Sequence, residues 1–362
     1  MNGSLPLALP DFPWDVLAPY AERARAHPGG AIDLSVGTPV DPTPAIVQQA
    51  LRDASDAPGY PTTAGRPELR AACARWMARS TGASVDVDAV LPTIGSKEMV
   101  AGLPRLLGLG TASSVVIPRI AYPTYAVGAV LAGAEYVATD EPESVPGADL
   151  VWLNSPGNPT GKVLSASRLA SIVDWARSTG TVLVSDECYI ELGWDEEPVS
   201  MLHPTVSGGS HDGLLVLHSL SKRSNLAGYR FGFLAGDPAL VSRILLVRKH
   251  SGMMVPSPIQ AAAIAALDDD EHVREQKDRY RRRRSLLMEA VTSAGFRIDD
   301  SQAGLYLWIT RDEPCWDTVG WFADRGVVVT PGDFYGPAGA RHVRLALTAT
   351  DHAMEQVPIR LA

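Results

Sequence analysis

The chain has 362 residues, 46% of them apolar and 20% charged, a composition typical of globular proteins. Its length exceeds the size at which one hydrophobic core usually keeps growing, so we expect two parts. The net charge of −9 argues against a general nucleic-acid or membrane-surface binder, because such proteins need basic patches.

The N-terminal segment, residues 1–30, predicts an irregular arm or a segment of the small domain. It contains several prolines but no basic region followed by an apolar stretch, so it does not read as a secretory signal. No run in the chain approaches the roughly 18 apolar residues of a membrane-spanning helix. The three cysteines, Cys73, Cys188 and Cys315, are widely spaced and odd in number, which favours a reducing cytoplasm over a disulfide framework.

Residues 60–250 alternate helical segments with short β-branched runs, a pattern that predicts βαβ units and a mostly parallel sheet. Three largely apolar runs, 149–153, 181–184 and 214–218, are each followed by polar residues. Ligands bind beyond the carboxyl ends of the strands in such sheets. We therefore expect the site where these runs end.

A long helical pattern follows from Pro258 to Ala294, and Gly295 is its expected stop. We interpret this pattern as a connector between two domains. Its basic run, residues 281–284, predicts a solvated helix face.

The segment after the connector has the composition of a small α+β domain. It contains a helical pattern between strand-like segments at 304–309, 327–330 and 342–347. The expected division is therefore a large domain at 31–260, and the connector with the small domain at 261–362.

The sharpest motif is Ser219-Leu-Ser-Lys222, followed eight residues later by Arg230 and then by Gly232. A lysine at a strand-to-loop junction can form an imine when burial or another cation lowers the pKa of its ammonium. A Ser-Lys pair alone is more often a surface lysine, so the interpretation depends on the complete spacing. The segment resembles the cofactor-lysine motif of the class I and II aminotransferases, which depend on pyridoxal phosphate (PLP).

A second motif lies upstream of the lysine. Residues 157–162 look like the phosphate loop of an NTPase, but only three residues separate the glycines and Val163 takes the place of the hydroxyl residue. The longer string Asn154-Ser-Pro-Gly-Asn158-Pro-Thr-Gly161 instead resembles the N-x-P-x-N-P-T-G loop of the aminotransferases. Taken alone it would simply predict a turn.

The resemblance covers the chain from about residue 30 to the end, with its landmarks in order. It implies the α/β architecture of PLP-dependent transferases of fold type I, in which a large domain with a mostly parallel, seven-stranded sheet carries a small α+β domain. It also implies a homodimer.

The resemblance gives four residues roles around the cofactor ring. Lys222 would carry the cofactor as an imine, and Asp186 would pair with the pyridinium nitrogen. A protonated nitrogen lets the ring act as an electron sink. Tyr189 and Asn158 would donate to the phenolate oxygen of the ring, and Asn158 would also reach the substrate carboxylate. The alternatives are a helix N-cap or a Walker-B-like acid for Asp186 and a packed aromatic for Tyr189.

The cofactor phosphate is expected between two segments. Arg230 and the hydroxyls of Ser219 and Ser221 form a set of donors suited to a dianion. Ser96 and Lys97 begin a predicted helix that resembles the family's phosphate-binding turn, because free amides and the helix dipole favour an anion there. The alternative for Ser96 is an ordinary N-cap.

Further roles also follow from the resemblance. Either Tyr122 or Tyr125 would stack on the cofactor ring, and Tyr60 would reach the phosphate site of a partner subunit. Arg344 would grip the α-carboxylate of the substrate, and Gly37 would let the backbone approach that substrate closely.

The implied reaction moves an amino group between an amino acid and a 2-oxo acid, with glutamate and 2-oxoglutarate as one pair. The segments 221–228 and 249–256 look similar to actinobacterial N-succinyldiaminopimelate aminotransferases, which implies N-succinyl-LL-2,6-diaminopimelate as substrate in the biosynthesis of lysine and diaminopimelate. The alternatives are an aspartate or aromatic aminotransferase, a C–S lyase of the same fold, and a PLP-binding sensor domain without turnover. No metal is expected.

Overall fold

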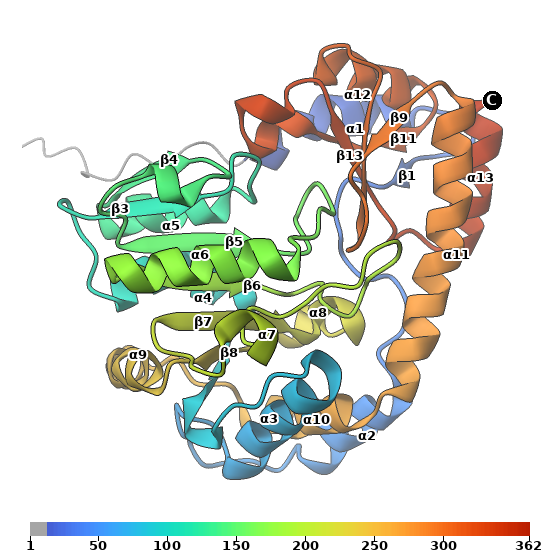
Figure 1. The fold of residues 1–362 in the computed structure, drawn as a ribbon. Helices are drawn as coiled ribbons and strands as arrows, with labels where there is room; N and C mark the ends of the chain where they lie inside the picture. Colours follow the sequence, from blue (N-terminus) through green and yellow to red (C-terminus); the bar gives the residue numbers. More distant parts are fainter. Residues whose placement is uncertain (1–12) are drawn as a thin grey trace, which may run out of the picture.

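The computed structural model describes residues 13–362, and its largest element is a seven-stranded sheet (Figure 1). The strand order is β2-β8-β7-β6-β5-β3-β4. All neighbours pair in parallel except β8, which is antiparallel to both β2 and β7. This sheet confirms the expected fold class. Its strands are β2 (Val90–Thr93), β3 (Ser114–Ile117), β4 (Glu135–Ala138), β5 (Leu150–Asn154), β6 (Val182–Asp186), β7 (Leu214–Ser219) and β8 (Gly232–Gly236).

Helices cover both faces of this sheet except at the edge strand β4, whose residues are all exposed, and this cover explains why the inner strands are almost continuously apolar. Along β5, Leu150 and Trp152 pack on one face, whereas Val151 and Leu153 pack on the other. The first face is covered by α4 (Ser96–Leu106), α5 (Thr124–Ala132) and α9 (Pro238–Ser251). The second face is covered by α3 (Pro67–Thr81), α6 (Ala166–Thr179) and α10 (Ser257–Asp268).

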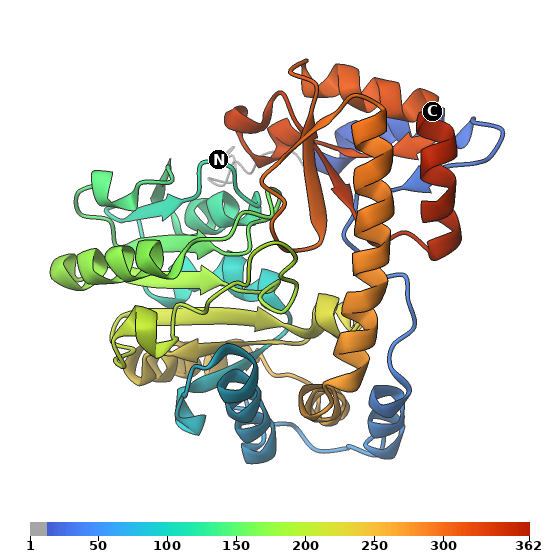
Figure 2. The same ribbon diagram turned by 45° about the vertical axis from the view of Figure 1, so that its right-hand side comes forward.

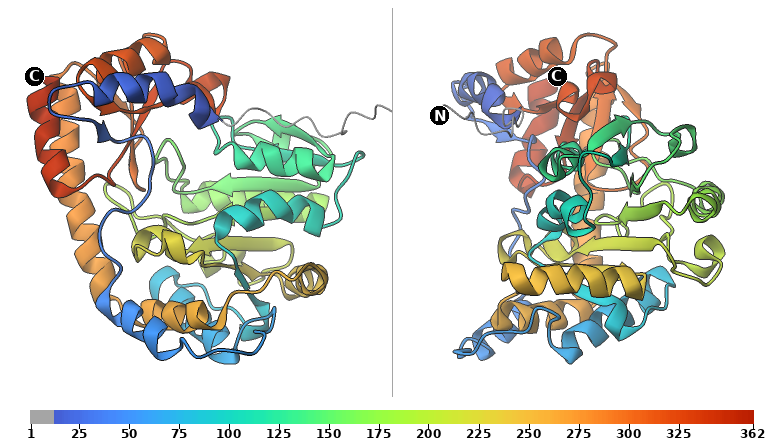
Figure 3. Two further views of the ribbon diagram at one scale, coloured as in Figure 1. Left: turned by 180° about the vertical axis from the view of Figure 1, so that it is seen from behind. Right: turned by 90° about the vertical axis from the view of Figure 1, so that its left-hand side faces the viewer.

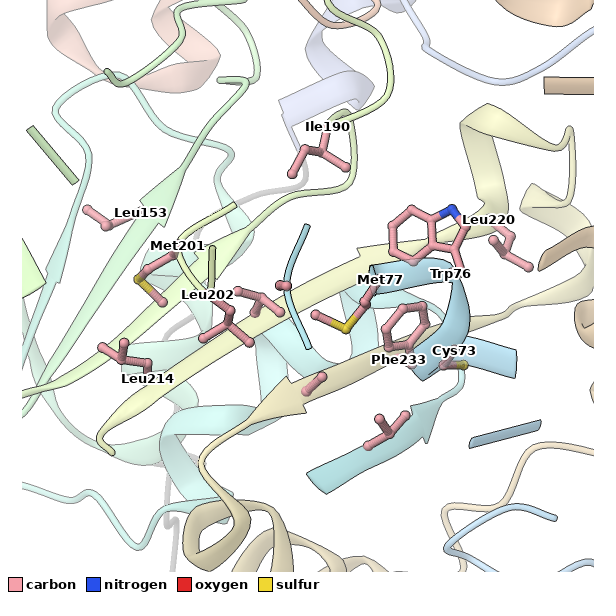
Figure 4. Close-up of a cluster of buried hydrophobic side chains, with 14 of the residues drawn as sticks. Cys73, Trp76, Met77, Leu153, Ile190, Met201, Leu202, Leu214, Leu220 and Phe233 are labelled. Atoms are coloured by element: carbon pink, nitrogen blue, oxygen red, sulfur yellow. The ribbon is translucent and has the colours of Figure 1, made fainter. Parts of the chain in front are cut away.

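Figure 4 shows part of the core on the second face. Trp76 and Met77 of α3 lie next to Phe233 of β8, and the Trp76 and Phe233 rings meet edge to face with centroids 5.7 Å apart. The short helix α7 (Pro204–Ser207) and α2 (Ala45–Asp53) complete the cover of this side. The sheet that carries the ends of β5, β6 and β7 is therefore packed against a continuous core on this face.

The C-terminal part has its own sheet and core. The four strands β9 (Arg297–Asp299), β10 (Tyr306–Thr310), β12 (Thr330–Pro331) and β13 (Val343–Ala346) pair antiparallel in the order β12-β13-β10-β9. A separate hydrophobic cluster surrounds them. Its helices are α1 (Ala18–Arg25), α11 (Glu271–Ser293), α12 (Cys315–Asp324) and α13 (Asp351–Leu361).

The start of the described chain belongs to this C-terminal cluster. Strand β1 (Ile32–Asp33) pairs in parallel with β11 (Val327–Val328), and α1 lies beside the C-terminal elements in both views of Figure 3. Leu34 is fully buried in the same cluster. We therefore propose that the large domain begins after residue 34 rather than at residue 31.

The long helical pattern at 258–294 is two helices instead of one. Helix α10 ends at Asp268, and Asp269 has an extended backbone (φ −113°, ψ 113°). The Asp269 carboxylate accepts hydrogen bonds from the Glu271 amide at 2.9 Å and from the His272 ring at 3.0 Å. An aspartate bonded in this way favours a helix start over a helix interior, so α11 begins anew at Glu271. Figure 2 shows α11 running from the level of α10 up to the C-terminal part.

The expectation of a solvated face at residues 281–284 is wrong for one residue in particular. Arg281 and Arg282 are exposed, but Arg283 is 3% exposed and bonds to the Asp41 carboxylate at 2.7 and 2.8 Å. Arg283 also donates to Asp351 at 2.6 Å. Consecutive residues of a helix point in different directions, so a basic run cannot lie on one face.

Six short 3₁₀ helices occur in the described part of the chain: η1 (Pro13–Leu17), η2 (Val87–Ala89), η3 (Pro142–Ser144), η4 (Ala227–Tyr229), η5 (Gly332–Tyr335) and η6 (Pro337–Gly339). A four-residue helix, α8 (Leu220–Arg223), follows β7 directly. Within residues 13–362, none of the helices combines the length and apolar character that crossing a bilayer requires.

Candidate active site

A cavity of about 540 Å³ lies where the sequence pattern places a site. Its walls come from the carboxyl ends of β5, β6 and β7, the first turn of α4, residues 36–38, and the strands β10 and β13. Twelve of the thirteen residues predicted for the site line it: Gly37, Ser96, Lys97, Tyr122, Asn158, Asp186, Tyr189, Ser219, Ser221, Lys222, Arg230 and Arg344. Both parts of the molecule therefore contribute to one cavity.

Lys222 lies on α8, whose start is held by a local hydrogen bond. The Ser221 amide donates to the Ser219 hydroxyl at 3.1 Å, which turns the chain sharply at the end of β7. The Lys222 ammonium donates to the Gly37 carbonyl. Burial lowers the pKa of Lys222 below its usual value. A lysine of this kind is more readily available as a neutral amine.

Asp186 ends β6 and is 8% exposed. Its carboxylate accepts hydrogen bonds from the Tyr125 hydroxyl at 2.8 Å and from the Cys188 amide at 3.2 Å. Burial raises the pKa of the Asp186 carboxyl. No described residue gives this carboxylate a cationic partner in an ion pair, so the site can accept a protonated nitrogen at this point.

The two candidate tyrosines occupy different positions. Tyr125 is 1% exposed, packs against Trp152 with ring centroids 5.0 Å apart, and uses its hydroxyl on Asp186. Tyr122 is only half-buried at the wall of the cavity, and the Lys97 nitrogen lies 5.8 Å from the centroid of its ring. Its ring is therefore the better placed of the two to contact a ligand.

The loop after β5 presents Asn158 to the cavity. The Asn154 side chain accepts from the Asn158 amide at 2.8 Å and donates to the Asp186 carbonyl at 2.9 Å, which ties the loop to β6. The Asn158 side-chain oxygen accepts from Arg344 at 2.9 Å. The amide nitrogen of that side chain can consequently donate to a ligand.

Arg344, on β13, is a buried cation with no carboxylate partner among the described residues. It is 3% exposed, donates to the Asn158 side chain and to the Ser35 carbonyl, and leaves its buried Nε without a hydrogen bond. The other buried arginines, Arg223, Arg248 and Arg283, each pair with a carboxylate. An unpaired buried guanidinium suits a ligand carboxylate.

Donors suited to a dianion meet at the other end of the cavity. Helix α4 begins at Ser96 without a side-chain cap, so its first amides are available. A Cβ atom at Gly95 (φ 77°) would overlap the Arg230 guanidinium, which shows how closely that cation approaches the helix start. The Ser219 and Ser221 hydroxyls are 2.9 Å apart beside them.

Tyr60 is the predicted residue that does not line the cavity. Its side chain is 95% exposed. Conversely, Tyr306 and Cys188 line the cavity without a site role predicted from the sequence, and Asn154 lines it as the first residue of the loop motif. Strand segment 304–309 had been noted only for its apolar pattern, and its alternation did not by itself indicate which face would meet the cavity.

The residues of this cavity fit PLP. A desolvated lysine, a buried carboxylate without a cation, and a cradle of amides, hydroxyls and a guanidinium match its aldehyde, ring nitrogen and phosphate. The part of the chain that the structure describes has no group of three or more His, Cys, Asp or Glu residues that could hold a metal ion. Fold and site together define an enzyme that uses PLP.

Comparison with known proteins identifies the family. The model of the family "Aminotransferase class I and II" matches residues 30–359. The chain is 56% identical over 356 residues to the 4-dedimethylamino-4-oxo-anhydrotetracycline transaminase OxyQ of Streptomyces rimosus, covering 98% of this chain and 99% of the relative. It is also 56% identical over 366 residues to the probable aminotransferase Rv1178 of Mycobacterium tuberculosis, covering 99% and 87%.

A solved structure agrees with this result. A probable N-succinyldiaminopimelate aminotransferase from Thermus thermophilus superposes with a TM-score of 0.87 at 27% identity, covering 97% of this chain and 99% of that one. The chain belongs to the class I and II aminotransferases, and it is a PLP-dependent transaminase.

Proposed function

We propose that this transaminase moves an amino group between N-succinyl-LL-2,6-diaminopimelate and 2-oxoglutarate, in the biosynthesis of lysine and diaminopimelate. In the reverse direction glutamate gives its amino group to the oxo form of the succinylated diamino acid. The observation that carries the amino-acid substrate is the unpaired, buried Arg344 facing the same cavity as Lys222. Likeness to the Thermus thermophilus protein supports the succinylated diamino acid.

A second candidate substrate rests on a specific observation. The relative from Streptomyces rimosus, at 56% identity, is named for a ketone on a tetracycline ring system. Under this alternative the cavity would accept a larger, ring-shaped oxo substrate, with glutamate as the donor. Parallel assays with glutamate as donor compare the oxo form of the succinylated diamino acid with the ring ketone, and their kcat/KM values distinguish the candidates.

The proposed roles around the cofactor use the contacts described above. Lys222 would hold the cofactor covalently through Nζ and, once released, would move a proton from the substrate Cα. PLP supplies an electron-withdrawing ring that makes this proton acidic. Asp186 would keep the ring nitrogen protonated, Tyr189 and Asn158 would donate to the ring oxygen, and Tyr122 would stack on the ring.

The remaining roles concern the two anionic ends of the bound molecules. The phosphate would be held by Ser96, Lys97, Ser219, Ser221 and Arg230. The substrate carboxylate would be held by Arg344 with Asn158, while Gly37 borders the same space. The two cationic ends of the cavity would thus orient cofactor and substrate relative to Lys222.

A homodimer completes the proposal, with Tyr60 of each subunit reaching the phosphate site of the other. A cytoplasmic location is part of it as well, and it is supported by three cysteines that are all free. Amino-acid and 2-oxo-acid substrates are the expected small-molecule partners, and neither nucleic acid nor membrane is expected to bind.

The first test is the visible spectrum of the purified enzyme before and after L-glutamate is added. We expect a visible band that bleaches with glutamate, and no bleaching in Lys222→Ala, because its side chain cannot bond the cofactor. Lys277→Ala is the matched control, since Lys277 lies on α11 near Trp194 and outside the cavity. A band that glutamate leaves unchanged but another amino acid alters would overturn the glutamate pair, and equal behaviour of Lys222→Ala and wild type would overturn the role of Lys222.

A further inference from the structure

We propose that Tyr306 is a positioning residue whose hydroxyl donates to the Tyr189 hydroxyl and so strengthens Tyr189 as a donor to the cofactor. This inference rests on the role proposed for Tyr189. It assigns a function to a side chain that lines the cavity but has no place in the motifs. Four contacts of Tyr306 carry it.

The first two contacts join Tyr306 to Tyr189. Tyr306 begins β10 and is 5% exposed, and its hydroxyl lies 3.1 Å from that of Tyr189. The two rings meet edge to face with centroids 5.7 Å apart. The pair is consequently both packed and hydrogen-bonded, so the direction of the Tyr189 hydroxyl depends on Tyr306.

The third contact explains why residue 37 is a glycine. A Cβ atom at Gly37 would overlap the Tyr306 hydroxyl. The carbonyl of the same residue accepts the hydrogen bond from Lys222. The missing side chain therefore makes room for the Tyr306 hydroxyl next to the lysine, which is a more specific reason for this glycine than close approach of a substrate.

The fourth contact supports the ring of Tyr306 from the substrate side. The Arg344 guanidinium carbon lies 4.0 Å from the ring centroid, a cation–π distance. Tyr306 therefore touches both the group proposed to bind the cofactor oxygen and the group proposed to bind the substrate carboxylate. Tyr306→Phe keeps the ring under Arg344 and removes only the hydroxyl.

The direction of the hydrogen bond follows from what each hydroxyl can reach. Only one hydroxyl of the pair can donate to the other. If Tyr189 gives its proton to the cofactor oxygen, Tyr306 must donate to Tyr189, and hydrogen bonds in such a chain strengthen one another. A stronger donor stabilises the negative charge of the ring oxygen, so this oxygen attracts the proton on the Lys222 nitrogen less strongly. The pH at which the nitrogen bonded to the cofactor loses its proton is therefore lower.

The test is a pH titration of the visible absorption of the holoenzyme, without substrate. It compares wild type, Tyr306→Phe, Tyr189→Phe and the double variant. A strengthening of about 10–30% in a hydrogen bond to a charged group corresponds to a rise of about 0.1–0.7 pH units for Tyr306→Phe. We expect a larger rise for Tyr189→Phe, and a double variant with the midpoint of Tyr189→Phe alone, because Tyr306 acts through Tyr189.

The other outcomes overturn the inference in distinguishable ways. A midpoint unchanged in Tyr306→Phe, or shifts that add in the double variant, means that Tyr306 does not act through Tyr189. A midpoint unchanged in Tyr189→Phe removes the role proposed for Tyr189 and with it this inference. If wild type forms no visible complex with the cofactor, the proposed function itself fails.

Discussion

At the scale of single residues, Glu187 and His218 form a buried pair directly behind the cavity. The Glu187 carboxylate oxygen lies 3.6 Å from the His218 ring nitrogen, and neither atom has a hydrogen-bond partner. Burial raises the pKa of Glu187 to about 7 and lowers the pKa of His218 to about 3. His218 is therefore neutral at neutral pH, and the two side chains do not form an ion pair there.

Glu187→Gln should change how stability depends on pH. The pKa of Glu187 in the folded protein, about 7, lies above its ordinary value of 4.5, so its stabilising contribution is complete below pH 4.5 and is lost as pH rises to 7. This loss amounts to about 3 kcal/mol at most. The amide side chain of the variant cannot ionise, so the variant should gain stability relative to wild type as pH rises from 4.5 to about 8.

The measurement is the free energy of unfolding of the cofactor-free protein across this pH range. Glu275→Gln is the control, because Glu275 is exposed on α11 and the pH profile should stay that of wild type. His218 contributes in the opposite sense, between about pH 3 and its ordinary value of 6.5, in both proteins. Parallel pH profiles for wild type and Glu187→Gln would contradict the prediction.

At the scale of elements, α11 is joined to two distant segments by one arginine. Arg283 pairs with Asp41, which precedes α2, and with Asp351, the first residue of α13. Burial by itself raises the pKa of Asp41, but the hydrogen bonds from Arg283 and Gln276 more than offset this, and the pKa is lowered. The ion pair is thus charged over the physiological range, and it connects the two parts of the molecule next to the cavity segment 36–38.

Arg283→Met should destabilise the protein by about 3–5 kcal/mol, because it leaves the partly buried Asp41 without its main partner while keeping a similar volume. Arg281→Met is the matched control on the same helix, since Arg281 is exposed and its ion pair with Asp278 contributes at most about 1 kcal/mol. Both are measured by thermal unfolding. A loss for Arg283→Met no larger than that for Arg281→Met would show that this contact does not hold α11 in place.

At the scale of the whole molecule, the proposed homodimer accounts for exposed apolar side chains in residues 36–60. This stretch exposes Val36, Val40, Ile46 and Tyr60 at 43%, 47%, 51% and 95%. These exposed apolar side chains are available to a partner subunit. A dimer would also bring Tyr60 toward a phosphate site that its own subunit does not offer it.

Sedimentation should therefore report twice the 38.6 kDa mass of one chain. Tyr60→Phe should leave this mass unchanged and weaken cofactor binding by about 10-fold or more, the effect of losing one hydrogen bond to a charged group. Tyr136→Phe, an exposed tyrosine on β4, is the control. A sedimentation mass of one chain for the wild-type protein would contradict the dimer. Cofactor binding by Tyr60→Phe as tight as that of wild type would contradict the role of Tyr60.

The sequence by itself determined the family, the cofactor and the order of the site segments along the chain. Motifs such as Ser219 to Gly232 and Asn154 to Gly161 are local, so their spacing is readable without a fold, and the apolar runs before them place them at strand ends. The same local reasoning predicted the class of sheet, because parallel strands covered on both faces must be continuously apolar.

Only the tertiary structure decided which distant side chains meet. Tyr306 and Tyr189 are 117 residues apart, and Arg283 and Asp41 are 242 apart, so no periodicity relates them. The sequence placed Tyr122 on the cofactor ring with Tyr125 as the competing choice, and packing separated the two by placing the Tyr125 hydroxyl on Asp186. The break at Asp269 likewise depended on its carboxylate accepting a hydrogen bond from the Glu271 amide, and helical periodicity does not predict such a bond.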